Sequence, residues 1–215
     1  MKKLKPAETL AEQAYQVIKK AIINNEFGPN EALVEEHIAQ ELGISRTPIR
    51  AALNQLAYEG LIEIKAGKGA RVSAISEKDV LDFQLLRDAL EPLAAKIAAD
   101  KINEQDIEQL RQICDQQYQS IANKDYYRFI ELDYQFHSKI AQITENAKLS
   151  EIVDNLNNQI QRFLILSNTL QDSALGAVEE HLTLVKALEA RDADLAEKMM
   201  RQHVQNVTTR ILTSS

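Results

Sequence analysis

Three of the four histidines stand at positions that helical periodicity assigns to a protein core. Asp133 and His137 are four residues apart, so both project from one face of a helix whose other residues are apolar. His181 and His203 occupy two further apolar stripes. The three stripes are Ile130, Asp133, His137 and Ile140; Val178, His181, Val185 and Leu188; and Met200, His203, Val207 and Ile211. Burying four polar side chains without partners costs several kcal/mol in total, whereas one shared metal ion would satisfy all of them.

These four side chains have the chemistry of a transition-metal site. Three neutral imidazoles and one carboxylate suit Zn best, with Ni, Co and Mn as alternatives. We therefore expect Asp133, His137, His181 and His203 to be the ligands of one divalent ion. An octahedral ion keeps two positions open, and the net positive charge of such a site attracts a small anion. The competing interpretation, in which each histidine is a separately hydrogen-bonded core residue, suits one histidine better than three.

A second group of residues has the chemistry of DNA recognition. Arg46 and Arg50 are four residues apart near the start of an expected helix, which puts them on one face. The planar fork of arginine pairs with guanine O6 and N7, while Ser45 and Thr47 are short donors suited to phosphate oxygens. In the competing interpretation the two arginines are solvated charges on a protein-interaction module. The basic hairpin that follows them favours DNA.

Charge is unevenly distributed along the chain. The whole chain carries −7, yet residues 1–75 hold 10 Lys and Arg against 9 Asp and Glu, whereas residues 76–215 hold 15 against 23. Gly67 and Lys68 lie at the tip of the expected basic hairpin, where glycine has no Cβ to obstruct a minor groove. A basic head on an acidic body fits a DNA-binding module joined to a part that stays off DNA.

The elements that must position the two arginines form a predicted winged helix-turn-helix. A first helix begins with a capping box at Thr9, and Gly43 makes the turn between the next two helices. The expected helices are 9–24, 34–42 and 45–58, and the expected strands are 61–65 and 70–73. The apolar face expected for the first helix consists of Leu10, Ala14, Val17 and Ala21.

From residue 76 onward the pattern predicts only helices. They are expected at 77–100, 104–122, 124–144, 147–170, 175–190 and 194–212, with the short linkers of an antiparallel bundle. The chain is thus expected to be mainly α, with a winged helix-turn-helix DNA-binding domain at 1–75 and an all-helical effector-binding and dimerisation domain at 76–215. No apolar run reaches the length of a membrane span. A single cysteine, Cys114, excludes an intramolecular disulfide, and the expected location is the cytoplasm.

The head resembles the DNA-binding domain of the GntR family of bacterial regulators. The resemblance covers about residues 9–74 and rests on Leu42-Gly-Ile-Ser-Arg-Thr-Pro-Ile-Arg-Ala-Ala-Leu53, Glu59-Gly-Leu61 and Gly67-Lys-Gly-Ala70. It implies that Arg46 and Arg50 contact bases, that Thr47 holds a phosphate and that the wing glycine enters the minor groove. Two residues depart from the family pattern. Ala51 replaces a usual glutamate, and Glu36 stands where several members have an arginine that helps to read the operator.

The helical body resembles the effector domain, or FCD domain, of the FadR subfamily. This resemblance spans about residues 78–212 and rests on segments 85–95, 132–137, 180–192 and 200–203. The count of six helices is similar to the VanR-type branch. The resemblance implies that Asp133, His137, His181 and His203 hold a metal, with a small carboxylate bound beside it.

Three further residues are candidates for contacting that carboxylate. Arg87 matches an arginine that in the family forms a salt bridge with the effector. Its alternative is a surface pair with Glu91, four residues on. Asn158 and Arg162, on the fourth body helix, are further candidates for the pocket. Cys114 is expected to pack in the core rather than to bind a ligand.

Together these observations predict a bacterial, ligand-responsive transcription regulator that binds DNA as a homodimer. It is expected to act as a repressor, to place its recognition helices in successive major grooves of a near-palindromic operator, and to respond to a small organic acid. Two alternatives remain. The first is a metal-dependent enzyme that acts on a small organic acid through metal-activated water. The second is a regulator that senses the metal itself.

Overall fold

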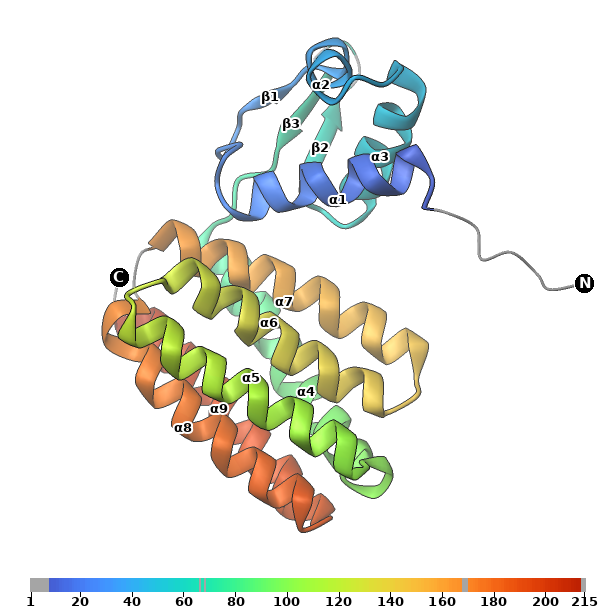
Figure 1. Ribbon diagram of the computed structural model, residues 1–215. Helices are drawn as coiled ribbons and strands as arrows, with labels where there is room; N and C mark the ends of the chain where they lie inside the picture. The colour runs from blue at the N-terminus through green and yellow to red at the C-terminus, as the bar shows by residue number, and fades with distance from the viewer. Residues whose placement is uncertain (1–7, 66, 68, 168–169, 214–215) are drawn as a thin grey trace, which may run out of the picture. The chain divides into compact units, whose positions relative to one another are not determined.

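The computed structural model describes residues 8–65, 67, 69–167 and 170–213 (Figure 1). The chain divides into two compact units, one ending at Ile75 and the other beginning at Ser76. The described residues form helices and one small sheet, which confirms the predicted mainly helical class. None of the described helices is long and apolar enough to cross a membrane.

The first unit is a winged helix-turn-helix, as predicted. Its elements are α1 (Leu10–Ile23), β1 (Ala32–Leu33), α2 (Glu35–Leu42), α3 (Arg46–Tyr58), β2 (Ile62–Lys65) and β3 (Gly69–Val72). The antiparallel sheet has the order β1-β3-β2, with Ile62 opposite Val72. The turn from α2 to α3 depends on Gly43, whose φ of 66° is left-handed and therefore suits glycine.

The core of this unit corrects one detail of the sequence analysis. Leu10 and Val17, which were expected on the apolar face of α1, are both more than half exposed, at 54% and 53%. The buried face instead consists of Ala14, Tyr15, Ile18, Ile22 and Ile23. Ala14, Ile18 and Ile22 follow one another at steps of four residues, so they form the tighter stripe, and α1 packs this side against α3. The predicted capping box at Thr9 is confirmed.

The sequence analysis did not predict β1. This strand has only two residues, too few for the alternation that identifies a strand. Its position comes from pairing, because Ala32 lies opposite Arg71 and Leu33 opposite Ala70 on β3. The third strand of the sheet is therefore a product of tertiary contacts.

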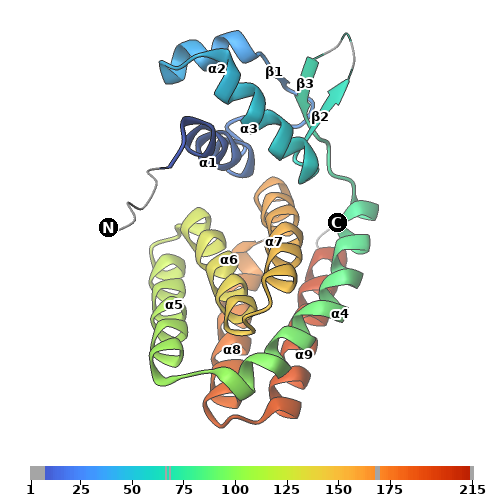
Figure 2. The same ribbon diagram turned by 90° about the vertical axis from the view of Figure 1, so that its right-hand side faces the viewer.

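The second unit contains six helices among its described residues. They are α4 (Glu77–Lys101), α5 (Glu104–Ala122), α6 (Tyr126–Ile143), α7 (Ala147–Ser167), α8 (Leu170–Glu189) and α9 (Ala193–Thr213). Figure 2 shows α4 and α9 side by side, which agrees with their extensive contact. α5 packs against both α6 and α8. The predicted start of the fifth body helix at residue 175 was too late, since α8 already includes Leu170.

A proline inside α4 shows how the bundle satisfies its own backbone. Pro92 is buried within the helix and has no N–H to donate to the carbonyl oxygen of Asp88. That oxygen instead accepts a hydrogen bond of 2.8 Å from Nη1 of Arg201 on α9. The same guanidinium nitrogen lies 3.1 Å from the Asp88 carboxylate. α4 therefore continues through the proline, and α9 supplies the missing donor.

Candidate metal centre and DNA-binding face

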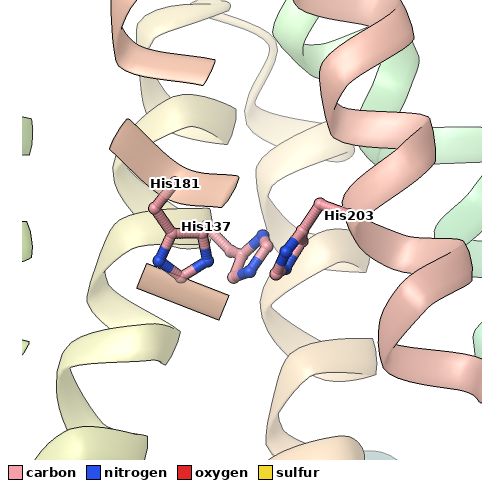
Figure 3. A group of neighbouring side chains, drawn as sticks. All are labelled: His137, His181 and His203. Atoms are coloured by element: carbon pink, nitrogen blue, oxygen red, sulfur yellow. The ribbon is translucent and has the colours of Figure 1, made fainter. Parts of the chain in front are cut away.

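The three predicted histidines meet in the interior of the second unit. His137 comes from α6, His181 from α8 and His203 from α9, and Figure 3 shows their rings turned toward one another. One ring nitrogen from each lies within 4.8 Å of the other two. All three side chains are almost completely buried. Helices separated along the chain thus bring together three imidazoles that the sequence places on separate stripes.

An oxygen lies close to the Nδ1 atom of each imidazole. Nδ1 of His137 lies 2.5 Å from Oε2 of Glu91, and Nδ1 of His203 lies 2.8 Å from Oε2 of Glu180. The third, Nδ1 of His181, lies 3.0 Å from the amide oxygen of Gln117. Because carboxylate and amide oxygens only accept, the proton of His181 and of His203 lies on Nδ1, which leaves a lone pair on Nε2, as in histidines that bind metals. Nδ1 of His137 is close to the Glu91 carboxylate but does not make a hydrogen bond with it.

The donor set fits a divalent metal ion. Nε2 of His137 and Nε2 of His181 are buried and have no hydrogen-bond partner among the described residues. The carboxylate of Asp133 lies 3.9 Å from the first of these atoms and 3.5 Å from the second. Buried nitrogen lone pairs without donors are costly unless something positive lies between them. The three histidines form the cluster itself, and Asp133 lies beside two of them. Imidazoles with a neighbouring carboxylate suit Zn and related transition metals.

Burial favours the neutral form of two of the three imidazoles, those of His181 and His203. Burial lowers the pKa of His181 well below its usual value, and the adjacent His203 and His137 lower it further. Burial also lowers the pKa of His203, although its bond to Glu180 opposes the shift. Neutral imidazole is the form that binds a metal.

The two carboxylates behind the histidines are held in their charged form. Burial by itself raises the pKa of Glu91, but the positive charge of Arg87 and the contact with His137 outweigh it, so that the pKa is lowered overall. Burial likewise raises the pKa of Glu180, while bonds from His203 and Arg210 lower it to about 2. Both groups are therefore anionic at neutral pH and can accept from Nδ1.

A pocket that is partly open to solvent lies beside the cluster and includes Asp133 in its lining. Its polar lining includes Arg87, Asp133, Ser173 and Arg210. The rest of its lining is apolar and consists of Phe129, Leu164, Ala174, Ala177, Val207 and Ile211. Two guanidinium groups and an apolar wall next to a metal-type site match a small organic anion.

Of the three residues predicted to bind an effector, only Arg87 lines the pocket. Arg87 also pairs with Glu91, with 2.5 Å between Nε and Oε1. The pair is buried, so the alternative of an exposed surface pair is wrong. Asn158 and Arg162 are buried on α7, and neither belongs to the lining of this pocket. Their role in binding an effector stays a prediction.

Four residues of this site were not singled out as site residues from the sequence, namely Glu91, Gln117, Glu180 and Arg210. Glu91 was considered only as a surface partner of Arg87. A signal for Gln117 existed, because it continues the buried stripe of Leu110 and Cys114 on α5. Cys114 is buried, as expected for a packing residue, and burial raises the pKa of its thiol to about 12. The fourth histidine, His37, is exposed.

The predicted DNA-reading residues lie on an exposed face of the first unit. Arg46 and Arg50 extend from the first two turns of α3, and both contact the same carboxylate, that of Glu35. Their shared face is thus confirmed by a common partner. Ser45 precedes α3 as its N-cap residue and makes no capping hydrogen bond with its side chain, and Thr47 is exposed.

The wing tip is described only in part. Gly67 has a left-handed φ of 74°, and a Cβ atom there would meet nothing within 4 Å. Glycine at this position is therefore required by the backbone conformation rather than by a close neighbour. Lys68, the other residue predicted at the tip, lies outside the described residues.

Comparisons with known proteins agree with both units. Residues 10–72 match the family of bacterial regulatory proteins called gntR, and residues 82–206 match the FCD domain. The chain therefore belongs to the GntR family of transcription regulators, and its FCD domain fits the FadR subfamily and the VanR-type branch. It is a regulator and not an enzyme, which removes the metalloenzyme alternative.

Relatives extend over nearly the whole chain. The chain is 31% identical over 205 residues to the HTH-type transcriptional repressor RspR of Escherichia coli (strain K12), covering 95% of this chain and 90% of that protein. It is 31% identical over 199 residues to a probable D-xylose utilization operon transcriptional repressor of Paenarthrobacter nicotinovorans, covering 91% and 86%. The solved structure of E. coli McbR/YncC has the same fold, with a TM-score of 0.86 at 19% identity, covering 96% and 99%.

The histidine cluster predicts a metal-dependent stability. We expect wild-type protein to hold roughly one divalent ion per chain, and a metal at 100 times its Kd to stabilise the fold by about 2.7 kcal/mol. His137→Ala combined with His181→Ala should abolish both the bound metal and the fall in Tm that a chelator causes. His37→Ala, at the exposed histidine, is the control and should behave as wild type. Elemental analysis that finds no metal in wild-type protein purified without chelator at near-neutral pH would contradict the assignment.

Proposed function

We propose that this regulator is a homodimeric repressor that reads a near-palindromic operator and releases it in response to a small carboxylate. The observation that carries the proposal is the buried cluster of three histidines, each of which brings one ring nitrogen within 4.8 Å of the others, beside a pocket with two arginines. Such a site in a regulator of this family is a receptor for a small molecule. Relatives that are named as repressors support the direction of control.

The proposed DNA-binding face consists of residues from α3 and the wing. Arg46 and Arg50 are exposed and reach beyond the helix, so they are suited to the edges of guanine bases in the major groove. Ser45 and Thr47 would bond to phosphates at the start of the same helix. Gly67 and Lys68 would enter the minor groove from the wing.

The proposed metal ligands are Asp133, His137, His181 and His203, with Zn as the first choice. A divalent ion held by these residues would supply a positive centre that attracts a carboxylate. Side chains of the pocket would supply the remaining contacts to the effector. Arg87 presents a guanidinium to the pocket, and Asn158 and Arg162 on α7 remain candidates for polar contacts to the effector.

The pocket is connected to the metal centre through shared carboxylates. Glu91 contacts both Arg87 and His137, and Glu180 contacts both Arg210 and His203. An anion that forms an ion pair with Arg87 or Arg210 therefore changes the contact between the shared carboxylate and its histidine. A ligand biases operator affinity only through its different affinity for two arrangements of the protein, and these linked contacts provide such a difference.

A stripe of exposed leucines on α4 supports a homodimer. Leu81, Leu85 and Leu93 follow one another at multiples of four residues, Leu86 lies beside them, and all are exposed. Leu85 has an exposed fraction of 71%, which is unusual for a large apolar side chain. Contiguous apolar residues on a helix surface mark an interaction site. A second copy of the chain, related by twofold symmetry, would cover the stripe with its own α4.

The DNA-binding face predicts a loss of specific binding in arginine variants. Arg46→Ala and Arg50→Ala should each weaken binding to an operator selected from random DNA by roughly 5- to 100-fold, since each removes one bidentate contact to guanine. Fluorescence anisotropy with labelled duplexes measures the effect. Arg111→Ala, at an exposed arginine of α5, is the matched control and should bind normally. Unchanged specific affinity in both head variants would refute the assigned recognition helix.

The pocket predicts a metal-dependent response to small carboxylic acids. In a thermal-shift screen, an acid that binds should raise Tm by an amount that grows with the logarithm of its concentration over its Kd, and a chelator should remove the shift. Arg87→Lys keeps the charge beside Glu91 but loses the fork, so it should reduce the shift several-fold. Shifts of equal size with and without metal would separate the effector from the metal centre.

The leucine stripe predicts a dimer that charge can disrupt. Leu81→Glu combined with Leu85→Glu should give a monomer in sedimentation velocity, because four carboxylates would be buried at a twofold interface. The monomer should also lose most of its affinity for a palindromic operator. Leu195→Glu, at an exposed leucine of α9, is the control and should stay dimeric. A double variant that remains a dimer would show that another surface mediates association.

A further inference from the structure

One carboxylate joins the two arginines of the DNA-binding face. Glu35 is the first residue of α2, and it reaches across the turn to the first two turns of α3. Its Oε1 accepts from Nε of Arg50 at 3.0 Å, and its Oε2 accepts from Nη2 of Arg50 at 2.8 Å. The same Oε2 accepts from Nη2 of Arg46 at 3.3 Å. Both helices of the helix-turn-helix thus contribute to one cluster of charges.

Arg50 and Glu35 form a bidentate salt bridge, which is the strong form of an arginine–carboxylate contact. Two parallel N–H groups of the guanidinium meet the two oxygens of the carboxylate, which fixes the plane of the arginine as well as its position. The carboxylate is more shielded than its partners. Its side chain is 26% exposed, while those of Arg46 and Arg50 are 57% and 61% exposed. Glu35 therefore lies beneath the two arginines and leaves their outer ends in solvent.

The donors that remain free of Glu35 define how Arg50 meets DNA. A guanidinium has five N–H groups, and Glu35 takes the one on Nε and one on Nη2. Both hydrogens of Nη1 and the second hydrogen of Nη2 are left, and the adjacent pair, one on Nη1 and one on Nη2, forms the outer end of the fork. That end matches O6 and N7 of a guanine. Arg46 gives only one N–H to Glu35 and keeps four.

An arginine that is already held in place loses less conformational freedom when it binds a base. Preorganisation of this kind strengthens only the contacts that need the fixed geometry, which here are those to bases. Phosphate contacts depend on charge rather than on orientation, and a carboxylate near the DNA backbone weakens them. Glu35 thus has opposite effects on the two kinds of binding.

We propose that Glu35 is a positioning residue that sets the specificity of operator recognition by holding the guanidinium groups of Arg46 and Arg50 in a fixed orientation. This inference rests on the proposed recognition role of the two arginines. Glu35 raises affinity for the operator and lowers affinity for unrelated DNA. The quantity that it controls is the ratio of the two affinities.

Glu35→Asp is the deciding variant. It keeps the charge, but its side chain is one methylene shorter and cannot span both arginines from the start of α2. We expect the ratio of specific to non-specific affinity of the full-length protein to fall roughly 10-fold, within the range for a bidentate arginine–guanine contact. The ratio is measured by anisotropy, with an operator selected by wild-type protein and a scrambled duplex of equal length. Base selection by the variant should also be less strict at the guanine positions.

Glu35→Gln and Glu41→Gln separate charge from geometry. Glu35→Gln should weaken operator binding and strengthen binding to scrambled DNA, because it loses both the two-point contact with Arg50 and a negative charge. Glu41→Gln removes an exposed charge from the same helix and should leave the ratio unchanged. A thermal melt of each variant verifies that the head is folded; the exposed ion pairs contribute little to stability.

Two results would overturn the inference. If Glu35→Asp keeps the wild-type ratio, or if Glu35→Gln strengthens binding to both DNAs equally, Glu35 acts only as a counter-charge. Failure of the proposed function looks different, because Arg46→Ala and Arg50→Ala would then leave operator affinity unchanged. Arginine variants that lose specific binding, together with Glu35 variants that keep the ratio, would reject the positioning role alone.

Discussion

The constraint on which the helical unit depends is the burial of three imidazoles at one point. Each ring needs a partner at Nδ1, because a buried N–H without an acceptor is costly. The bundle meets this need from three separate helices, with Glu91 on α4, Gln117 on α5 and Glu180 on α8. With these oxygens in place, one ring nitrogen of each histidine lies within 4.8 Å of the other two. Of the two arginines of the adjacent pocket, Arg87 comes from α4, one of the same helices, and Arg210 comes from α9.

Two of these acceptors carry a charge, and each charge is shared with an arginine of the pocket. A buried ion pair is weak evidence for stability, since desolvation offsets much of its attraction. We interpret Glu91 and Glu180 instead as links between the pocket and the histidine cluster. Each contacts a histidine on one side and a guanidinium on the other. His181 has only the neutral Gln117 behind it. Two of the three histidines are therefore linked through a carboxylate to an arginine of the pocket, and the third is not.

The head uses a carboxylate in a related way, but at the surface. Glu35 orients two arginines that stay exposed, whereas Glu91 and Glu180 orient histidines that are buried. In both units an acidic residue contacts a group to which we assign binding of another molecule, the arginines of the first unit and the histidines of the second. The negative charge of the chain as a whole is thus compatible with DNA binding, because part of it positions the basic residues.

The sequence by itself determined the elements of this protein and the faces on which its functional residues lie. Gly43 and the spacing of Arg46 and Arg50 predict the helix-turn-helix, and the stripes of His137, His181 and His203 predict that these residues face a core. These features are local, because helical periodicity relates residues only three or four positions apart. Tertiary structure alone decided which faces meet. It put Gln117 behind His181, 64 residues away, and it brought Glu35 beneath Arg50 across the turn. Partners such as these depend on how helices pack, which no local period encodes.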